Sequence, residues 1–179
     1  MNIFVLDKDP VKCAQKHYDV HVKKMCVEYA QILSSCFHIL DRDNIDMWGK
    51  GIYKLYSKNH PAIKWACDSF DNYIWLQELW IALLREYYYR FGKKHASTKL
   101  KYLRRGYCPM NIVEYFDRPA WYDYESKDFI VVNKEDLIVD GTILSKDDPI
   151  LWYNYLYKLP KEHGGKLHLY GYTRRKECD

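Results

Sequence analysis

The sequence predicts a mainly α-helical protein, folded as one compact domain with a small β-hairpin in its C-terminal third. Three observations predict this fold class. Apolar residues recur at helical spacing along two long stretches between Asp9 and Phe91. Each stretch opens at a proline, which fits the first position of a helix. After Pro119 the pattern changes to short apolar runs separated by polar turn residues, as in a hairpin.

The first helical stretch begins at Asp9-Pro10, because an Asp side chain can accept hydrogen bonds from free amides and Pro needs no amide there. Its apolar spacing continues to about residue 39, which predicts one amphipathic helix. Before it, residues 3–6 form an apolar run that we expect to be a strand or an extended segment pinned against the core. A polar loop over residues 41–51 follows the helix.

The second helical region opens at Asn59-His60-Pro61 and carries a wide apolar face. Gly92 is a natural C-terminal stop, since glycine readily adopts the left-handed conformation. Asp68-Ser69 can divide the region into two helices, and periodicity alone leaves both possibilities open. The loop after Gly92 extends to Pro109.

We treat residues 1–179 as a single domain with three parts. Residues 1–109 hold the helical core and a basic segment, residues 119–147 are an insertion that contains the hairpin, and residues 148–179 are a C-terminal helix and tail. The chain is long enough for about two thirds of its unfolded surface to be buried.

Within the insertion, residues 129–132 and 137–144 are the predicted strands, and the polar run 133–136 is their turn. Asp148-Pro149 then marks the start of the last helix.

Composition excludes several classes of protein. No apolar run approaches the roughly 20 residues that span a bilayer, and the first residues lack a secretory signal pattern. Six scattered cysteines without a C-x-x-C pair indicate reduced thiols. Reduced thiols favour a reducing compartment, so we expect a cytoplasmic protein with no membrane partner. We also expect a monomer with no metal and no cofactor. The net charge of +4 is mild, so attraction to a polyanion must come from local clusters.

Such a cluster occurs in the basic segment, residues 85–107. It contains eight Lys or Arg side chains against one carboxylate, interleaved with six aromatic rings. Cations neutralise phosphates and flat rings stack on unpaired bases, so one interpretation is a nucleic-acid surface. The other is a solvated helix end followed by a Lys-rich loop. The residues expected to contact nucleic acid here are Arg90, Lys93, Lys94, His95, Lys99 and Lys101.

The first predicted helix also carries a polar stripe. His17, His21, Lys24 and Glu28 fall at offsets 0, 4, 7 and 11, which places them on one helix face. Two imidazoles, a cation and a carboxylate can exchange protons and hold an anion, as a catalytic or phosphate-contacting face would. A solvated stripe and a divalent-metal site are the alternatives. We predict no metal, because the carboxylate does not directly follow the first histidine.

The second helical region offers residues that suit a displaced base. Asn72 and Trp75 lie three positions apart, and an amide that pairs with a base edge beside an indole that stacks on it is what an extruded base requires. Alternatively, Trp75 belongs to the core and Asn72 is a satisfied amide. Asn59 and His60 add polar groups ahead of the helix.

The chain has no P-loop, no G-x-G-x-x-G motif and no serine nucleophile elbow. ATP-driven, nicotinamide-dependent and triad hydrolase chemistries therefore lack their usual sequence support.

Many residues between Met1 and His95 match a pattern found in a class of small phage proteins. They are Met1 to Asp7, Asp9-Pro10, Cys13-Ala14, His17, Asp19, His21-Val22, Lys24-Met25, Glu28, Ala30-Gln31, Asn59-His60-Pro61, Trp65, Asn72-Tyr73, Trp75-Leu76, Glu86-Tyr87, Arg90, Gly92-Lys93 and His95. This pattern resembles the pyrimidine-dimer DNA glycosylases of the endonuclease V type. A segment near that family's C-terminus is echoed around Trp121.

The resemblance implies a compact helical domain that kinks damaged DNA, flips a nucleotide out and cleaves its glycosidic bond. In the family the N-terminal α-amine forms a Schiff base with the sugar, and a helix-borne glutamate assists strand elimination. Here the amine belongs to Met1, which we expect to be retained because Asn2 is bulky. An α-amine with a pKa near 7.7 to 8.0 keeps a usable neutral fraction. The family glutamate has no clean equivalent; Glu28 is the best candidate, and Lys24 is an alternative Schiff-base former.

These observations lead us to expect a phage DNA-repair enzyme, a DNA glycosylase and AP lyase acting on a flipped, damaged or modified pyrimidine. Its catalytic residues would be Met1, His17, His21, Lys24 and Glu28, and Asn72, Trp75 or Trp121 would contact the base. Two alternatives stay open. One is a phage transferase that modifies DNA bases on the same scaffold, and the other is a non-catalytic nucleic-acid-binding module.

Overall fold

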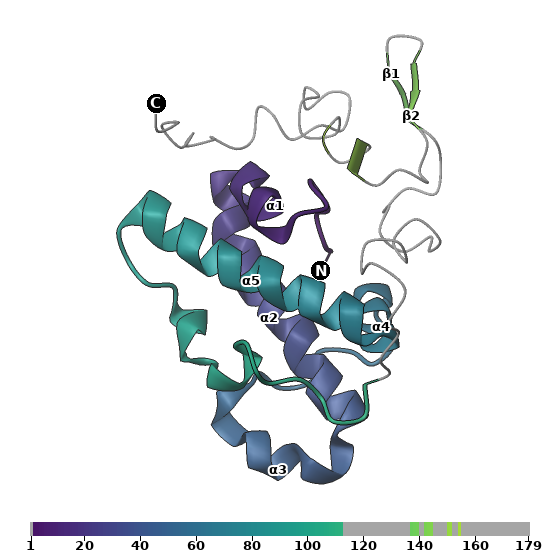
Figure 1. Cartoon of the computed structure of the whole chain (residues 1–179), viewed down its shortest axis with the longest axis vertical. Helices are drawn as coiled ribbons and strands as arrows, with labels where there is room; N and C mark the ends of the chain where they lie inside the picture. Colours follow the sequence, from purple (N-terminus) through teal and green to yellow (C-terminus); the bar gives the residue numbers. More distant parts are fainter. Residues whose placement is uncertain (1, 113–136, 140–141, 145–149, 152–153, 155–179) are drawn as a thin grey trace.

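The computed structural model of the chain describes residues 2–112, 137–139, 142–144, 150–151 and 154. In this part of the chain the protein is mainly helical, as the sequence predicts (Figure 1). The α-helices in chain order are α1 (Pro10–Lys16), α2 (Asp19–Leu40), α3 (Ile45–Trp48), α4 (Pro61–Asp68) and α5 (Phe70–Phe91). Short 3-10 helices are η1 (Arg42–Asn44), η2 (Gly49–Gly51), η3 (Ala96–Lys99) and η4 (Lys101–Leu103).

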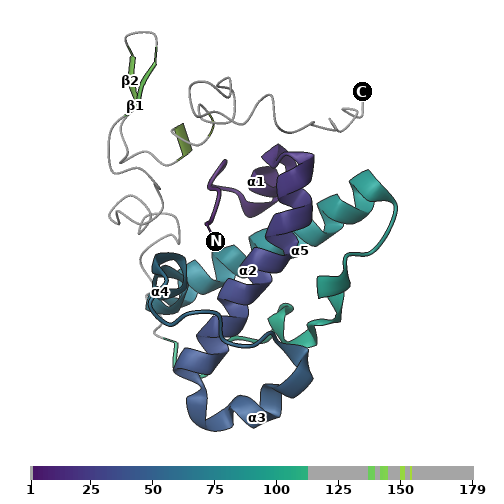
Figure 2. The ribbon, with the colours of Figure 1, turned by 180° about the vertical axis from the view of Figure 1, so that it is seen from behind.

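The two longest helices, α2 and α5, cross at the centre of the molecule (Figure 1). Helix α1 packs on α5, and α4 packs on both α2 and α5. Seen from behind, α3 lies at the end of α2 that is remote from α1 (Figure 2). Helix α5 therefore contacts α1, α2 and α4, and its orientation determines which of its faces packs on each of them.

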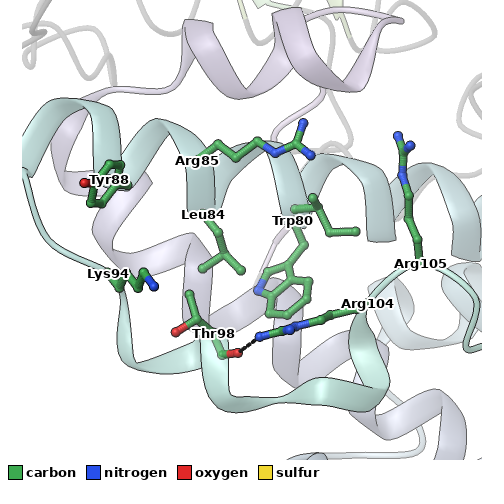
Figure 3. Close-up of a pocket in the computed structure, with 9 residues that line it drawn as sticks. Trp80, Leu84, Arg85, Tyr88, Lys94, Thr98, Arg104 and Arg105 are labelled. Atoms are coloured by element: carbon green, nitrogen blue, oxygen red, sulfur yellow. Dashed lines mark hydrogen bonds between the residues drawn. The ribbon is translucent and has the colours of Figure 1, made fainter.

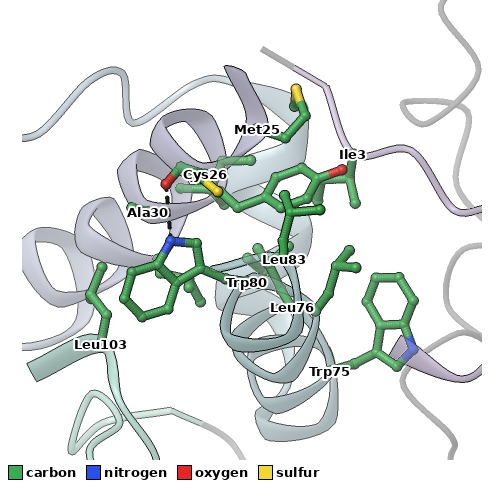
Figure 4. Packing of buried hydrophobic residues seen from close by; sticks show 14 of the residues in the cluster. Ile3, Met25, Cys26, Ala30, Trp75, Leu76, Trp80, Leu83 and Leu103 are labelled. Carbon is green, nitrogen blue, oxygen red and sulfur yellow. Dashed lines mark hydrogen bonds between the residues drawn. The ribbon is translucent and has the colours of Figure 1, made fainter. Parts of the chain in front are cut away.

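The hydrophobic core fills the space between α2 and α5 (Figure 4). Trp80 is fully buried there, and its indole N–H donates to the carbonyl of Cys26 at 2.9 Å. Tyr29 and Phe37 of α2 and Tyr73 of α5 are also fully buried. A buried indole needs a hydrogen-bond partner, and the bond from Trp80 therefore fixes the rotation of α5 against α2.

The first helical stretch is not one helix. Asp9 caps α1 as expected, its carboxylate accepting from the amides of Val11 and Lys12 at 2.7 and 3.1 Å. However, His17 and Tyr18 are extended and separate α1 from α2. The single helix predicted to residue 39 is therefore wrong at this point. The His17 ring bonds to the carbonyl of Cys13 at 2.8 Å, which completes the end of α1.

The second helical region divides at Ser69, one of the two possibilities that periodicity left open. Ser69 is extended, and its hydroxyl accepts from the amide of Asn72 at 3.1 Å, which caps α5. At the other end Gly92 adopts the left-handed conformation with φ of 65°, and its N–H donates to the carbonyl of Tyr88. The predicted helix stop at Gly92 is confirmed.

The N-terminal apolar run is an extended segment pinned against the core, with Ile3, Val5 and Leu6 buried. The amide of Phe4 donates to the hydroxyl of Tyr29 at 3.1 Å, and the carbonyl of Phe4 accepts from the Cys13 thiol at 3.2 Å. The start of the described chain therefore lies along α2.

The segment after α5 folds back along that helix. Leu100 and Leu103 are buried, and the Gln77 side chain on α5 donates to the carbonyls of Arg104 and Tyr107 at 3.1 and 2.8 Å. Gly51 lies so close to the ring of Tyr102 that no Cβ fits between them. These contacts hold residues 93–107 in a defined position facing α5.

In the C-terminal third, β1 (Leu137–Val139) and β2 (Thr142–Leu144) pair antiparallel, with Ile138 opposite Ile143. The predicted first strand, residues 129–132, lies outside the described residues, so its pairing stays a prediction. Residues 137–144, predicted as one strand, instead contain the two paired strands β1 and β2. The Asn154 side chain donates to the carbonyls of Leu6 and Ile150 at 2.9 and 2.7 Å.

In the described part of the chain, no helix is both long and apolar enough to cross a membrane. The described cysteines are free, and Cys13, Cys26 and Cys36 are buried. Burial raises the pKa of Cys13 and Cys26 to about 12, so both are protonated core thiols at neutral pH.

Candidate nucleic-acid interface

A groove of about 570 Å³ lies between α5 and the segment that folds back along it (Figure 3). We call it the α5 groove. Its lining residues are Trp80, Ile81, Leu84, Arg85, Tyr88, Lys94, Thr98, Arg104 and Arg105. The volume is within the range of pockets that bury small organic ligands.

One wall and the floor of the groove come from a single face of α5. Ile81, Leu84, Arg85 and Tyr88 follow one another at three- and four-residue spacing, so their side chains emerge on the same side of the helix. Ile81 and Leu84 are half-buried and give the groove an apolar floor, which the fully buried indole of Trp80 borders.

The opposite wall is polar and cationic. Lys94, Thr98, Arg104 and Arg105 come from residues 93–107. The guanidinium of Arg104 donates to the carbonyl of Thr98 at 2.7 Å, which holds Arg104 along the rim of the groove (Figure 3).

The groove carries an excess of positive charge. Four of its lining side chains are cationic. Arg105 forms an ion pair with Glu78 at 3.0 Å, but Arg85 and Lys94 are exposed and have no ion-pair partner among the described residues. Cations gathered in a concave site raise the local potential more than isolated surface charges do, so the groove favours an anionic ligand.

Tyr88 is the exposed ring of the groove. The residue retains 56% of its accessible surface, and its side chain has no hydrogen bond or ring contact with the described residues. The preceding residue differs, since Tyr87 packs its ring edge-on against Phe91 and His95. Tyr88 is therefore available to stack on a flat ligand.

The other cations of the basic segment have different surroundings. Lys93, Lys99 and Lys101 are exposed as expected but do not line the groove, and the ammonium of Lys101 lies 4.7 Å from the ring centre of Tyr102. His95 is half-buried and caps η3 by accepting from the amide of Ser97 at 3.1 Å. Burial lowers the pKa of His95, which favours its neutral form.

Arg90 is not a surface cation, which corrects the expectation that it contacts nucleic acid. Its side chain is 1% exposed and pairs with Glu86 at 2.7 Å and Asp19 at 2.9 Å. The same guanidinium donates to the carbonyls of Gln15 and His17 at 2.8 and 2.7 Å. Sequence alone did not separate this interior arginine from the exposed lysines that follow it.

The polar stripe expected on the first helix also needs correction. Because the helix breaks at His17, this residue is not on the face of α2 that carries the other members. His17 is fully buried, and its two ring nitrogens lie 2.8 Å from the Cys13 carbonyl and 2.8 Å from the Tyr29 hydroxyl. Burial lowers its pKa to about 3, so His17 is neutral and structural at physiological pH.

The remaining members of the stripe lie on α2 and do not line the α5 groove. His21 is buried under Phe4, with ring centres 4.5 Å apart. Lys24 and Glu28 form an ion pair at 3.2 Å and keep 65% and 14% of their side-chain surface. Of the predicted stripe, these two are the members that solvent reaches most readily.

The residues predicted to contact a displaced base on the second helical region are also interior. Asn72 is fully buried and its amide donates to the carbonyl of Trp65 at 2.9 Å. Trp75 is 6% exposed and donates to the carbonyl of Lys8 at 2.7 Å. Trp75 therefore belongs to the core, as the alternative interpretation holds. The Asn72 amide is buried but only partly satisfied, because its oxygen has no hydrogen-bond partner among the described residues.

Two further predicted site residues, Asn59 and His60, do not line the groove. Asn59 is exposed in the loop before α4, and His60 caps α4 by accepting from the amide of Ala62 at 3.2 Å. Met1 and Trp121 lie outside the described residues. Within the described part of the chain, no three His, Cys, Asp or Glu side chains gather as metal ligands do.

Comparison of the chain with protein families, curated proteins and solved structures gave no match. The α5 groove was not predicted as a site, although all four of its cations belong to the basic segment and Lys94 was expected to contact nucleic acid. The sequence feature that could have indicated the groove is the spacing of four residues that share one helix face: Ile81, Leu84, Arg85 and Tyr88.

We predict that Arg90→Ala lowers the free energy of unfolding by about 3–5 kcal/mol, because it leaves buried Glu86 without its cation. Arg85→Ala, in the exposed part of the same helix, should change it by less than about 0.5 kcal/mol. Urea denaturation of both variants checks this. Equal effects would show that Arg90 is not a structural ion-pair centre.

We also predict that His17 makes the fold acid-sensitive. The unfolded chain takes up a proton at His17 near the ordinary pKa of 6.5, whereas the folded chain resists it to about 3. Its contribution to stability is complete above pH 6.5 and is lost as the pH falls. Between pH 7.5 and 5 the loss should be about 2 kcal/mol. Urea denaturation at the two pH values measures it, and His17→Gln should reduce the difference; an unchanged difference would contradict the assignment.

Proposed function

We propose that this protein binds DNA through the α5 groove. The observation that carries the proposal is the meeting of four cations and an exposed tyrosine around one groove with an apolar floor. Salt-bridged surface cations, by contrast, would give no reason to expect a polyanionic partner.

The charges of the groove suit a phosphate backbone. Guanidinium groups present several N–H donors in a plane and match phosphate oxygens, and a lysine ammonium adds a mobile point charge. Arg85 and Lys94 stand on opposite walls without ion-pair partners among the described residues, so they need not break an existing pair to reach a phosphate. Lys93, Lys99 and Lys101 extend the positive surface beyond the groove.

Substituting two of the groove cations that have no ion-pair partner among the described residues tests the proposal. Arg85→Ala with Lys94→Ala should weaken DNA binding and reduce the slope of log affinity against log salt by about 1 to 2, because two phosphate contacts are lost. Fluorescence anisotropy across a salt series measures the slope. A matched control is Lys12→Ala with Lys64→Ala, which removes the same charge from exposed positions on α1 and α4. Equal slopes for the two double variants would contradict the proposal.

A second candidate function is the glycosylase and AP lyase chemistry that the family resemblance implies. One observation favours it: the described chain start lies along α2, where Phe4 stacks on His21 and bonds to Tyr29. Lys24 and Glu28 are accessible on the same helix. In this proposal the neutral amine of Met1 or of Lys24 attacks C1′ of the sugar, the glycosidic bond breaks and the base leaves, and loss of a proton from the nitrogen opens the sugar ring to a Schiff base. Glu28 then takes a proton from C2′ as the 3′ phosphate leaves.

Borohydride trapping on abasic duplex DNA tests this chemistry. The lyase proposal predicts a covalent adduct that Glu28→Gln still forms, together with at least a tenfold slower strand cleavage. Asp46→Asn, an exposed carboxylate on α3, is the control and should cleave at the wild-type rate. No adduct and no cleavage would exclude the lyase. Cleavage that survives a blocked N-terminus would assign the attack to a lysine, and base modification without cleavage would support the transferase alternative.

A further inference from the structure

We propose that the α5 groove selects single-stranded DNA over duplex, holding one unpaired base on the ring of Tyr88 above the apolar floor. This inference rests on the proposed DNA binding and names the form of DNA that the groove accepts. Three features of the groove support it, and binding to phosphates alone explains none of them.

The first feature is the apolar floor. Leu84 lies at the base of the groove, between its two walls (Figure 3), and Ile81 and the buried indole of Trp80 also line the groove. A duplex turns its phosphates and sugars outward and keeps its bases stacked inside, so it offers no apolar surface to this floor. An unpaired base does, because it has a flat face and is free to leave the stack.

The second feature is the position of Tyr88. A ring that is 56% exposed, with no ring partner among the described residues, stands on the groove wall four residues after Leu84. Aromatic side chains combined with a cationic groove are the usual means of binding single strands, since every base has a face that can stack.

The third feature is size. A groove of about 570 Å³ has the volume of a small-ligand pocket, which a nucleotide fills and a double helix cannot enter. Arg85 on α5 and Lys94 and Arg104 on the facing segment then place cations on both sides of a base that is held on Tyr88. The DNA phosphates on either side of that base can then contact Lys94 or the arginines.

The experiment compares binding of a fluorescent single strand of about 15 nucleotides with binding of the duplex of the same sequence. The wild-type protein should bind the single strand more tightly. Tyr88→Ala should weaken single-strand binding by about 5- to 100-fold and duplex binding by less than about 2-fold, since stacking is lost and the charges remain. Tyr88→Phe keeps the ring and should stay within about 2-fold of wild type. Tyr56→Ala is the matched control, because Tyr56 is also 56% exposed and lies outside the groove.

The outcomes separate this inference from the function on which it rests. Equal affinity for the two forms, or equal weakening of both by Tyr88→Ala, overturns the single-strand proposal. DNA binding itself then still stands if Arg85→Ala with Lys94→Ala weakens it. No binding to either form overturns the proposed function and this inference together.

Discussion

The buried guanidinium of Arg90 is the interaction on which the arrangement of the helices depends. It bonds to the end of α1 through the carbonyls of Gln15 and His17, to the start of α2 through Asp19, and to its own helix through Glu86. A buried charge is tolerated only when it is paired and fully hydrogen-bonded, so these groups must meet in one geometry. That geometry turns one face of α5 toward α1 and α2 and leaves another for the segment after Gly92.

The opposite roles of neighbouring cations follow from this constraint. Arg90 is neutralised inside the protein, whereas Arg85, five residues earlier, lies on the face that lines the α5 groove. The facing segment is positioned by the bonds from Gln77 and by the close packing of Tyr102 on Gly51. The groove is therefore a product of packing between α5 and a segment that the core holds in place, and its positive charge does not depend on the interior ion pairs.

The predictions from sequence are confirmed for features that neighbouring residues decide. The cap at Asp9 and the left-handed stop at Gly92 depend on residues within one helical turn, and both were predicted. The predictions were wrong where contacts between separate elements decide the position of a side chain. The helical spacing of the first stretch continues through His17, but a buried bond to Tyr29 holds this ring in the core. Asn72 has a side chain of the type that often binds ligands, but it is buried in the core and its amide bonds to the carbonyl of Trp65. No local pattern distinguishes these cases, because the deciding partner lies in another element.

We propose that nucleic acid meets the protein at the α5 groove and not at the face of α2 that carries Lys24 and Glu28. NMR titration of the isotope-labelled protein with a short single strand locates the contact surface. Amide signals of Tyr88, Lys94 and Thr98 and the side-chain signals of Arg85 should shift first and furthest. Shifts concentrated at Lys24 and Glu28, with the groove signals unchanged, would contradict it.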